Sequence, residues 1–246
     1  MSAELSATAT VEEILSKKSV IELRELARSF YVKGSSKMRK VELISEVKAA
    51  LMIPERLEEL LYVLDSAAWQ TFRKAAETSE PVQLNLTESR WYQILHGLCY
   101  LHFITGNRSL ACNVPPEIRT VYNSLVTDGL IQRKKHYDQL HLYAEAAANL
   151  YGVISQDDFV ALFNSQNEDI TSKEELFDAL IRHIVVDAGY CFWDKYIVDI
   201  GFEDNGFADV SDLLAQIGDK PRYIPEKKEF LKYADWRYFE HNEHSR

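Results

Sequence analysis

The chain has 246 residues, of which 46% are hydrophobic and 27% charged, and its net charge is −10. These totals exclude a wholly disordered protein and predict one large domain or two to three small ones. Three widely spaced cysteines, Cys99, Cys112 and Cys191, exclude a disulfide framework and suit a reducing compartment.

The N-terminus, MSAELSATATVEE, is acidic and lacks the basic-then-apolar order of a signal peptide. No apolar run approaches 18 residues, which is the length that a membrane helix needs. We therefore expect a cytoplasmic protein that makes no membrane contact.

Positive charge is concentrated near the start of the chain. Residues 17–48 hold nine Lys/Arg against four Glu, a net charge of +5, whereas residues 49–246 carry a net charge of −12. A polyanion is attracted to the first region and repelled by the second. Any contact with DNA or RNA is therefore expected in residues 17–48.

The first elements read as a helical hairpin over residues 1–53. Thr10 to Glu13 and Ser19 to Glu22 both fit the capping box that opens a helix. Gly34 suits a left-handed helix end, and a second helix is predicted from Lys37 to Met52. The inward residues of the first helix are Val20, Leu23, Leu26, Ala27 and Phe30. Those of the second are Val41, Leu43, Ile44, Val47 and Leu51.

The stretch LSKKSVIELRELARSFYVKGSSKMRKVELISEVKAAL carries a family resemblance. Its IELRELA helix, the Val32-Lys33-Gly34 step and SKMRKVELI at 36–44 resemble the helical N-terminal domain of the transcription terminator Rho, itself similar to SAP-type DNA-binding hairpins. The resemblance covers about residues 11–52 and implies a nucleic-acid-binding module. Rho continues into an OB-type barrel and a phosphate-loop motor, whereas residues 55–100 here look helical and no GxxxxGK[ST] motif is present.

Six residues form the candidate site at the start of the second predicted helix. A helix N-terminus exposes unpaired N–H groups and favours an anion, and cations and hydroxyls beside it would complete a phosphate clamp. The alternative is a solvated basic face, or one that pairs with the acidic remainder. Little base reading is expected, because no aromatic-rich platform accompanies the charges. The candidate residues are Lys33, Ser35, Ser36, Lys37, Arg39 and Lys40.

Residues 54–136 are predicted to form a second, winged-helix-like unit. Leu57 to Leu64 mark one helix, and Asp65 caps the next. Thr87 is expected to cap a helix over residues 88–103, before a short strand in SLACNV and a helix after the tandem prolines. The basic RKKHY at 133–137 is predicted to be an exposed connection between domains.

Residues 137–246 repeat that layout. Ser155 and Ser172 are predicted helix caps, and YCFWDKYIVDIGF reads as a β-hairpin that turns at Asp194-Lys195. Two further helices are expected near 211–217 and 226–239. The fold class is mainly α, with short β-hairpins in two units that resemble winged-helix-like bodies of bacterial proteins.

The residues give little support to metal or catalytic chemistry. His96, Cys99 and His102 share a predicted helix face, with Cys112 as the nearest fourth ligand, but paired ligand spacing is lacking and core packing is expected instead. Catalytic motifs are also lacking. We therefore expect no cofactor, no metal and no enzymatic activity.

The sequence thus predicts a nucleic-acid-binding protein of low sequence specificity, in the context of transcription termination or regulation. The acidic remainder would limit non-specific coating of nucleic acid or dock a protein partner. The alternative function is a protein-interaction adaptor whose basic head docks an acidic protein surface.

Overall fold

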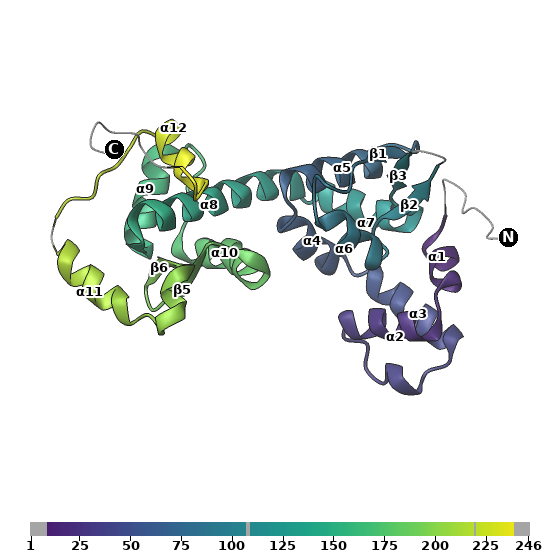
Figure 1. The fold of residues 1–246 in the computed structure, drawn as a ribbon. Helices are drawn as coiled ribbons and strands as arrows, with labels where there is room; N and C mark the ends of the chain where they lie inside the picture. Colours follow the sequence, from purple (N-terminus) through teal and green to yellow (C-terminus); the bar gives the residue numbers. More distant parts are fainter. Residues whose placement is uncertain (1–8, 107–108, 219, 239–246) are drawn as a thin grey trace. The chain divides into compact units, whose positions relative to one another are not determined.

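A computed structural model describes residues 9–106, 109–218 and 220–238, and the chain divides into two units between residues 131 and 132 (Figure 1). Predictions that reach residues 1–8 or 239–246 extend outside the described part. Helices dominate both units, and each unit holds a small antiparallel sheet, which confirms the predicted fold class.

The N-terminal hairpin consists of α1 (Val11–Lys17), α2 (Val20–Ser29), a 3-10 turn η1 (Ser35–Lys37) and α3 (Lys40–Leu51). Both predicted capping boxes form. The hydroxyls of Thr10 and Ser19 accept hydrogen bonds from the N–H groups of Glu13 and Glu22 at 3.2 Å, and the two glutamates accept from the cap N–H groups in return.

The core of the hairpin lies between α2 and α3, where Leu23, Leu26, Ala27, Leu43, Val47 and Leu51 are buried. The predicted inward position of Val41 is wrong, since its side chain is 78% exposed. Helix α3 begins at Lys40 rather than at Lys37. Val41 lies two residues, about 200° of helical rotation, before the buried Leu43 and therefore faces the opposite side.

The end of α2 is closed by Tyr31 and not by Gly34. Tyr31 has a left-handed φ of +56°. Its N–H donates to Arg28 O at 2.9 Å, and the N–H of Val32 donates to Ala27 O at 2.7 Å. This pair of bonds is a Schellman motif, in which the left-handed position is usually glycine. Gly34 is also left-handed, but it begins the 3-10 turn.

The hairpin packs on the remainder of the first unit. Glu117 accepts the N–H of Val11 at 3.1 Å and lies 3.9 Å from Lys48 Nζ. Phe30 packs edge-on against Tyr100, with ring centroids 6.1 Å apart. A boundary between separate domains at residues 53 and 54 stays a prediction.

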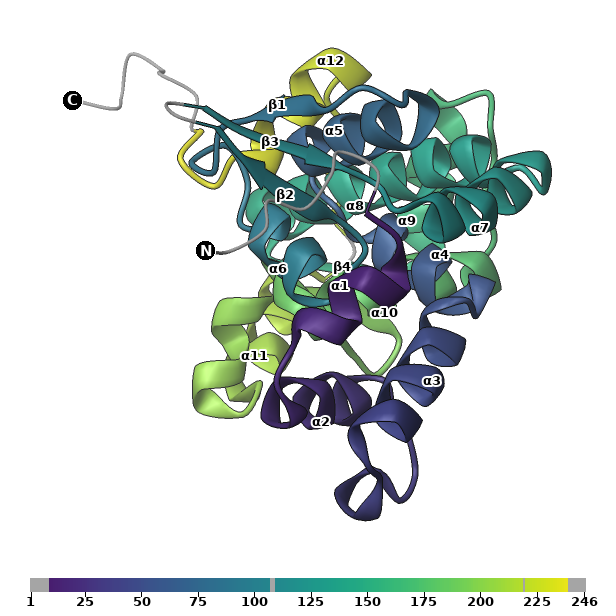
Figure 2. The same cartoon turned by 90° about the vertical axis from the view of Figure 1, so that its right-hand side faces the viewer.

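The rest of the first unit is a small sheet covered by helices (Figure 2). Its strand order is β1-β3-β2, all antiparallel, with Val82 opposite Cys112 and Phe103 opposite Cys112 on the other side. Helix α5 packs on β1 and β3, and α7 packs on α4 and α5. The elements are α4 (Pro54–Tyr62), α5 (Ser66–Glu77), β1 (Val82–Leu84), α6 (Trp91–Gly97), β2 (His102–Thr105), β3 (Leu110–Asn113) and α7 (Pro116–Thr127).

The predicted helix over residues 88–103 is wrong at both ends. Thr87 does not cap it: its N–H and hydroxyl donate to Asn85 Oδ1, at 3.2 and 2.8 Å, and the residues directly after it are not helical. The helix starts only at Trp91. It ends where Cys99 takes a φ of +64°, so that the chain turns directly into strand β2.

The second unit has the same strand order as the first, β4-β6-β5, again antiparallel. Ser155 and Ser172 cap α9 and α10 as predicted, and the hairpin turns at Asp194-Lys195 as predicted. The elements are α8 (Leu130–Tyr151), β4 (Val153–Ser155), α9 (Gln156–Gln166), α10 (Lys173–Asp187), β5 (Tyr190–Trp193), β6 (Tyr196–Asp199), η2 (Ile200–Asn205), α11 (Ala208–Ile217), α12 (Lys227–Phe230) and η3 (Leu231–Ala234).

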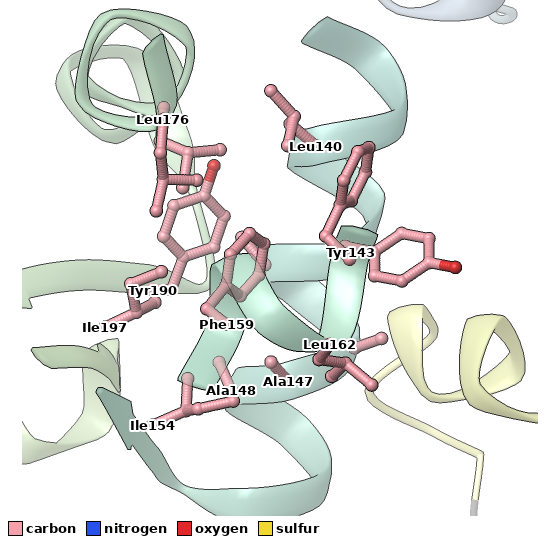
Figure 3. Packing of buried hydrophobic residues seen from close by; sticks show 14 of the residues in the cluster. Leu140, Tyr143, Ala147, Ala148, Ile154, Phe159, Leu162, Leu176, Tyr190 and Ile197 are labelled. Carbon is pink, nitrogen blue, oxygen red and sulfur yellow. The ribbon is translucent and has the colours of Figure 1, made fainter. Parts of the chain in front are cut away.

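The core of the second unit is aromatic and alanine-rich. Figure 3 shows Tyr190 and Ile197 directed from the strands toward Phe159 of α9, with Ala147 and Ala148 of α8 beside them. Four alanines of α8 belong to this buried cluster: Ala144, Ala146, Ala147 and Ala148. The two helices α9 and α10 followed by the β5-β6 hairpin match the predicted layout, whereas helix α8 and strand β4 before them were not predicted. The assignment of this unit as winged-helix-like stays a prediction.

The RKKHY segment is not an exposed connection. It lies inside α8, the helix in which the boundary between the two units falls. The side chain of Lys134 is only 1% exposed and forms an ion pair with Asp138 one turn later. Within the described residues, no helix combines the length and the apolar character that crossing a bilayer requires.

Candidate nucleic-acid interface

The predicted site residues gather in the loop between α2 and α3 and in the first residue of α3. Both views place this loop at the end of the hairpin that lies farthest from the β1-β3-β2 sheet of the same unit (Figures 1 and 2). The Schellman turn at Tyr31 directs the chain out of α2, and the 3-10 turn at Ser35–Lys37 brings it back toward α3.

Lys33, Lys37 and Arg39 are exposed, and none of them has an ion-pair partner among the described residues. Ser36 is exposed beside them, whereas Ser35 is buried in the 3-10 turn. Three cations and one hydroxyl therefore face solvent in one loop. Whether they hold phosphate stays a prediction.

Two other basic residues of the region are engaged within the chain. Lys40 Nζ donates to the carbonyl oxygen of Ser16 at 2.8 Å, at the end of α1. Lys48 Nζ lies 2.8 Å from Glu12 Oε2, and this carboxylate raises the pKa of Lys48. The amino group of Lys40 thus helps to hold α1 against α3. The positive charge of Lys48 is offset by the carboxylate of Glu12.

The N-terminus of α3 already holds a carboxylate. The N–H of Arg39 donates to Glu42 Oε2 at 2.7 Å, which satisfies one of the free donors of this helix end. The N-terminus of α3 is therefore a weaker anion site than the sequence predicts. Phosphate contact at this loop depends chiefly on the side chains of Lys33, Lys37 and Arg39.

Sequence reasoning missed Tyr31, whose side chain is 88% exposed next to these cations. A single aromatic residue in a helix-end sequence gives no periodic signal, so the sequence does not show that its ring faces solvent. Arg56, on α4, was missed as well. Its guanidinium carbon lies 5.7 Å from the ring centroid of Phe30, the residue that precedes Tyr31.

Of the four residues considered for metal binding, Cys99, His102 and Cys112 are buried and His96 is partly buried. No group of three or more His, Cys, Asp or Glu within the described ranges is arranged to hold a metal ion. His96 stacks on Phe103 with centroids 4.1 Å apart, and the rings of His96 and His102 are 6.4 Å apart. Burial lowers the pKa of both histidines and raises the pKa of Cys99 to about 11 and that of Cys112 to about 12.

The helices that a winged helix would present to a groove, α6 and α10, carry no net positive charge. In α6, Trp91 and Tyr92 are buried. In α10, Phe177 is 49% and Val185 is 79% exposed, and the acidic Glu174 and Asp178 also face solvent. These surfaces are apolar or acidic, and neither suits a phosphate backbone.

The second unit also contains a buried polar cluster between α8, α10 and β5. His141 and His183 stack with ring centroids 3.9 Å apart, and His141 Nδ1 lies 2.9 Å from the hydroxyl oxygen of Tyr190. Glu145 accepts the N–H of Gly189 at 2.9 Å. Burial lowers the pKa of His141 to about 4 and that of His183 to about 3, and it raises the pKa of Glu145.

Comparison with protein-family models matches residues 15–55 to the Rho termination factor, N-terminal domain. This confirms the predicted resemblance and points to nucleic-acid binding in general. The matched segment spans the hairpin from α1 to the start of α4 and includes the whole exposed basic loop. Neither the curated proteins nor the solved structures gave a match to the chain.

Proposed function

We propose that this protein binds nucleic acid with low sequence specificity, through phosphate contacts made by Lys33, Lys37 and Arg39. Ser36 adds a hydroxyl to this surface. Lys40 adds positive charge nearby, although its amino group is hydrogen-bonded to the carbonyl oxygen of Ser16. The observation that carries the proposal is the group of three exposed cations without a described ion pair, inside the segment that matches the Rho N-terminal domain.

The proposed contacts are made to phosphates, and this supports low specificity. Lysine and arginine side chains are long and flexible and can bind phosphates next to any base. Phosphate contacts therefore carry no sequence information. The acidic remainder of the chain repels additional phosphate and so restricts binding to the loop. We further propose a non-enzymatic role in transcription termination or regulation.

Charge reversal at the loop tests the phosphate contacts. Lys33→Glu, Lys37→Glu and Arg39→Glu combined should abolish binding of labelled single-stranded and duplex DNA and RNA in fluorescence anisotropy. Lys40 is left unchanged, because its bond to Ser16 would be lost as well and the hairpin could loosen.

The matched control reverses three exposed lysines of the second unit, Lys135, Lys220 and Lys228. Both triple variants change the net charge by the same amount, so the control reports the effect of overall charge. Equal loss of binding in the two variants, or retained binding in the loop variant, contradicts the proposal.

The exposed face of α10 favours a second candidate function, a protein-interaction adaptor. Phe177 and Val185 are exposed among acidic residues, which suits a protein partner better than nucleic acid. Phe177→Ser combined with Val185→Ser should release such a partner and leave nucleic-acid binding unchanged. In the other form of the adaptor, the basic residues 17–48 dock an acidic protein. The charge-reversed loop variant would then lose a protein partner, and the wild-type protein would bind no nucleic acid.

A further inference from the structure

A pocket of about 320 Å³ opens beside the basic loop, between the end of α2, the second half of α3 and the start of α4. Its lining includes Phe30, Tyr31, Lys33, Glu46 and Arg56. The volume lies within the range of sites that hold small ligands, about 300–1,000 Å³. The pocket shares Lys33 with the proposed phosphate surface and is otherwise distinct from it.

Tyr31 is held at the rim of this pocket at a conformational cost. The left-handed position of a Schellman motif favours glycine, because a side chain there meets the backbone. Here the position carries a large ring that is 88% exposed and therefore gains little from packing. Strain that packing does not explain, at an exposed aromatic beside cations, points to a binding role.

The floor of the pocket is fixed. Phe30 is buried, and its ring lies between Tyr100, at 6.1 Å edge-on, and the guanidinium of Arg56, at 5.7 Å. Arg56 Nη1 is buried and has no hydrogen-bond partner among the described residues. A buried N–H group without an acceptor is rare in folded proteins.

The pocket lining combines aromatic surface with charges of both signs. The carboxylate of Glu46 offsets part of the positive charge of Lys33 and Arg56, and the rings of Phe30 and Tyr31 favour a flat group that can stack. Lys33 at the rim provides a cation for a phosphate just outside. This combination of an aromatic stacking surface next to backbone-binding cations is the arrangement by which proteins hold single strands.

We propose that the pocket takes one unpaired nucleobase of a single-stranded nucleic acid, stacked on Tyr31, while Lys33, Lys37 and Arg39 hold the flanking phosphates. The inference rests on the proposed function and narrows its ligand to single strands. Bases within a duplex are already stacked and cannot enter. Stacking tolerates every base, so no sequence preference is implied.

Tyr31→Gly tests the proposal without a folding penalty, because glycine suits the left-handed position. The variant should bind a single-stranded 12-mer about tenfold more weakly, whereas its duplex affinity and its melting temperature should not fall. Tyr31→Phe should retain single-strand affinity. Trp236→Gly removes an exposed aromatic of the second unit, 78% exposed, and should change neither affinity.

A second variant fills the pocket and leaves Tyr31 in place. Ala49 is an exposed α3 residue in the pocket lining, and leucine is a good helix former. Ala49→Leu should weaken single-strand binding several-fold and leave duplex binding unchanged.

The outcomes separate this inference from the phosphate contacts. If the charge-reversed loop loses binding while Tyr31→Gly and Ala49→Leu both bind single strands as wild type does, the base pocket is refuted and the phosphate contacts stand. If Tyr31→Gly weakens single-strand binding while charge reversal does not, the phosphate contacts are refuted and the pocket stands. Equal weakening for single strands and duplexes refutes the pocket, and a wild-type protein that binds neither refutes both.

Discussion

His141 and His183 place two titratable rings against each other inside the second unit. His183 is 8% exposed, and its Nε2 makes no hydrogen bond within the described residues. Tyr190 from β5, Glu145 and Lys134 from α8, and Arg182 from α10 are the polar and charged groups that surround the pair. Because desolvation disfavours the imidazolium form, both rings are neutral in the folded protein at neutral pH.

This burial makes stability depend on pH. Both folded-state pKa values, about 4 and about 3, lie below the ordinary value of 6.5, so the unfolded chain takes up protons first as the pH falls. The contribution to stability is complete above pH 6.5 and is lost as the pH falls from 6.5 toward 4. At pH 5 the loss should reach about 2 kcal/mol per histidine in the free energy of unfolding, measured by urea denaturation.

His183→Leu separates the histidines from other acid effects. The variant should lose about half of the difference in unfolding free energy between pH 7.5 and pH 5, with little change at pH 7.5. Glu145 acts in the opposite direction, because its raised pKa favours the folded state as the pH falls. An unchanged pH dependence in His183→Leu contradicts the assignment.

At the scale of the element, Glu42 at the start of α3 has two opposed effects: it caps the helix, and we expect it to weaken the binding of phosphate. Glu42 accepts the N–H of Arg39 and stabilises the helix, but it also places a carboxylate beside the cations of the loop. Glu42→Gln should lower stability by about 0.5 kcal/mol and tighten nucleic-acid binding two- to threefold at low salt. Anisotropy titrations and urea denaturation measure the two effects.

Glu13→Gln is the matched control for that change. Glu13 closes the same kind of capping box in α1, where its carboxylate accepts the N–H of Thr10 at 2.8 Å. Its stability loss should be similar, without the gain in affinity. An equal gain would mean that Glu42 acts only through the net charge of the protein.

Four helix starts could be predicted from the sequence, and two helix ends could not. Thr10, Ser19, Ser155 and Ser172 all cap helices as expected, because each hydroxyl accepts the N–H three residues later, a bond within a single helical turn. The ends of α2 and α6 use left-handed Tyr31 and Cys99. Neither residue type signals a helix end, since tyrosine and cysteine rarely adopt the left-handed conformation.

Two further differences between the predicted and the observed structure arise from local hydrogen bonds and ion pairs. Thr87 donates to Asn85 in a local turn, and the expected helix begins only four residues later, at Trp91. The ion pair of Lys134 with Asp138 takes one cation of RKKHY into the protein. A charge cluster in a sequence shows that cations are present, but not which of them find an acid one helical turn away.

At the scale of the whole molecule, the loop remains a small positive region in a chain of net charge −10. The sequence predicted this segregation, because counting charges needs no coordinates. It could not separate exposed Lys33, Lys37 and Arg39 from Lys40 and Lys48, whose amino groups are held by Ser16 and Glu12. That distinction depends on how α1 packs against α3.

Salt dependence should report this small number of free cations. For three phosphate contacts to a single strand, the logarithm of the binding constant should fall with the logarithm of salt concentration with a slope of about −2. Lys37→Gln should reduce the magnitude of the slope by about 0.7, and the exposed Lys135→Gln should leave it unchanged. Titrations at several potassium chloride concentrations measure the slope, and a value near zero for the wild type contradicts electrostatic binding.

The shared strand order has a consequence for how each unit assembles during synthesis. In both sheets the strand made first pairs with the strand made last, so β1 waits for β3 and β4 waits for β6, whereas the hairpins β2-β3 and β5-β6 close locally. Local pairs form before distant ones because short loops lose less entropy on closing. We expect each hairpin to form first and to serve as the template on which the earlier strand docks, so a ribosome stalled between β4 and β6 would present β4 as an unpaired apolar segment to chaperones.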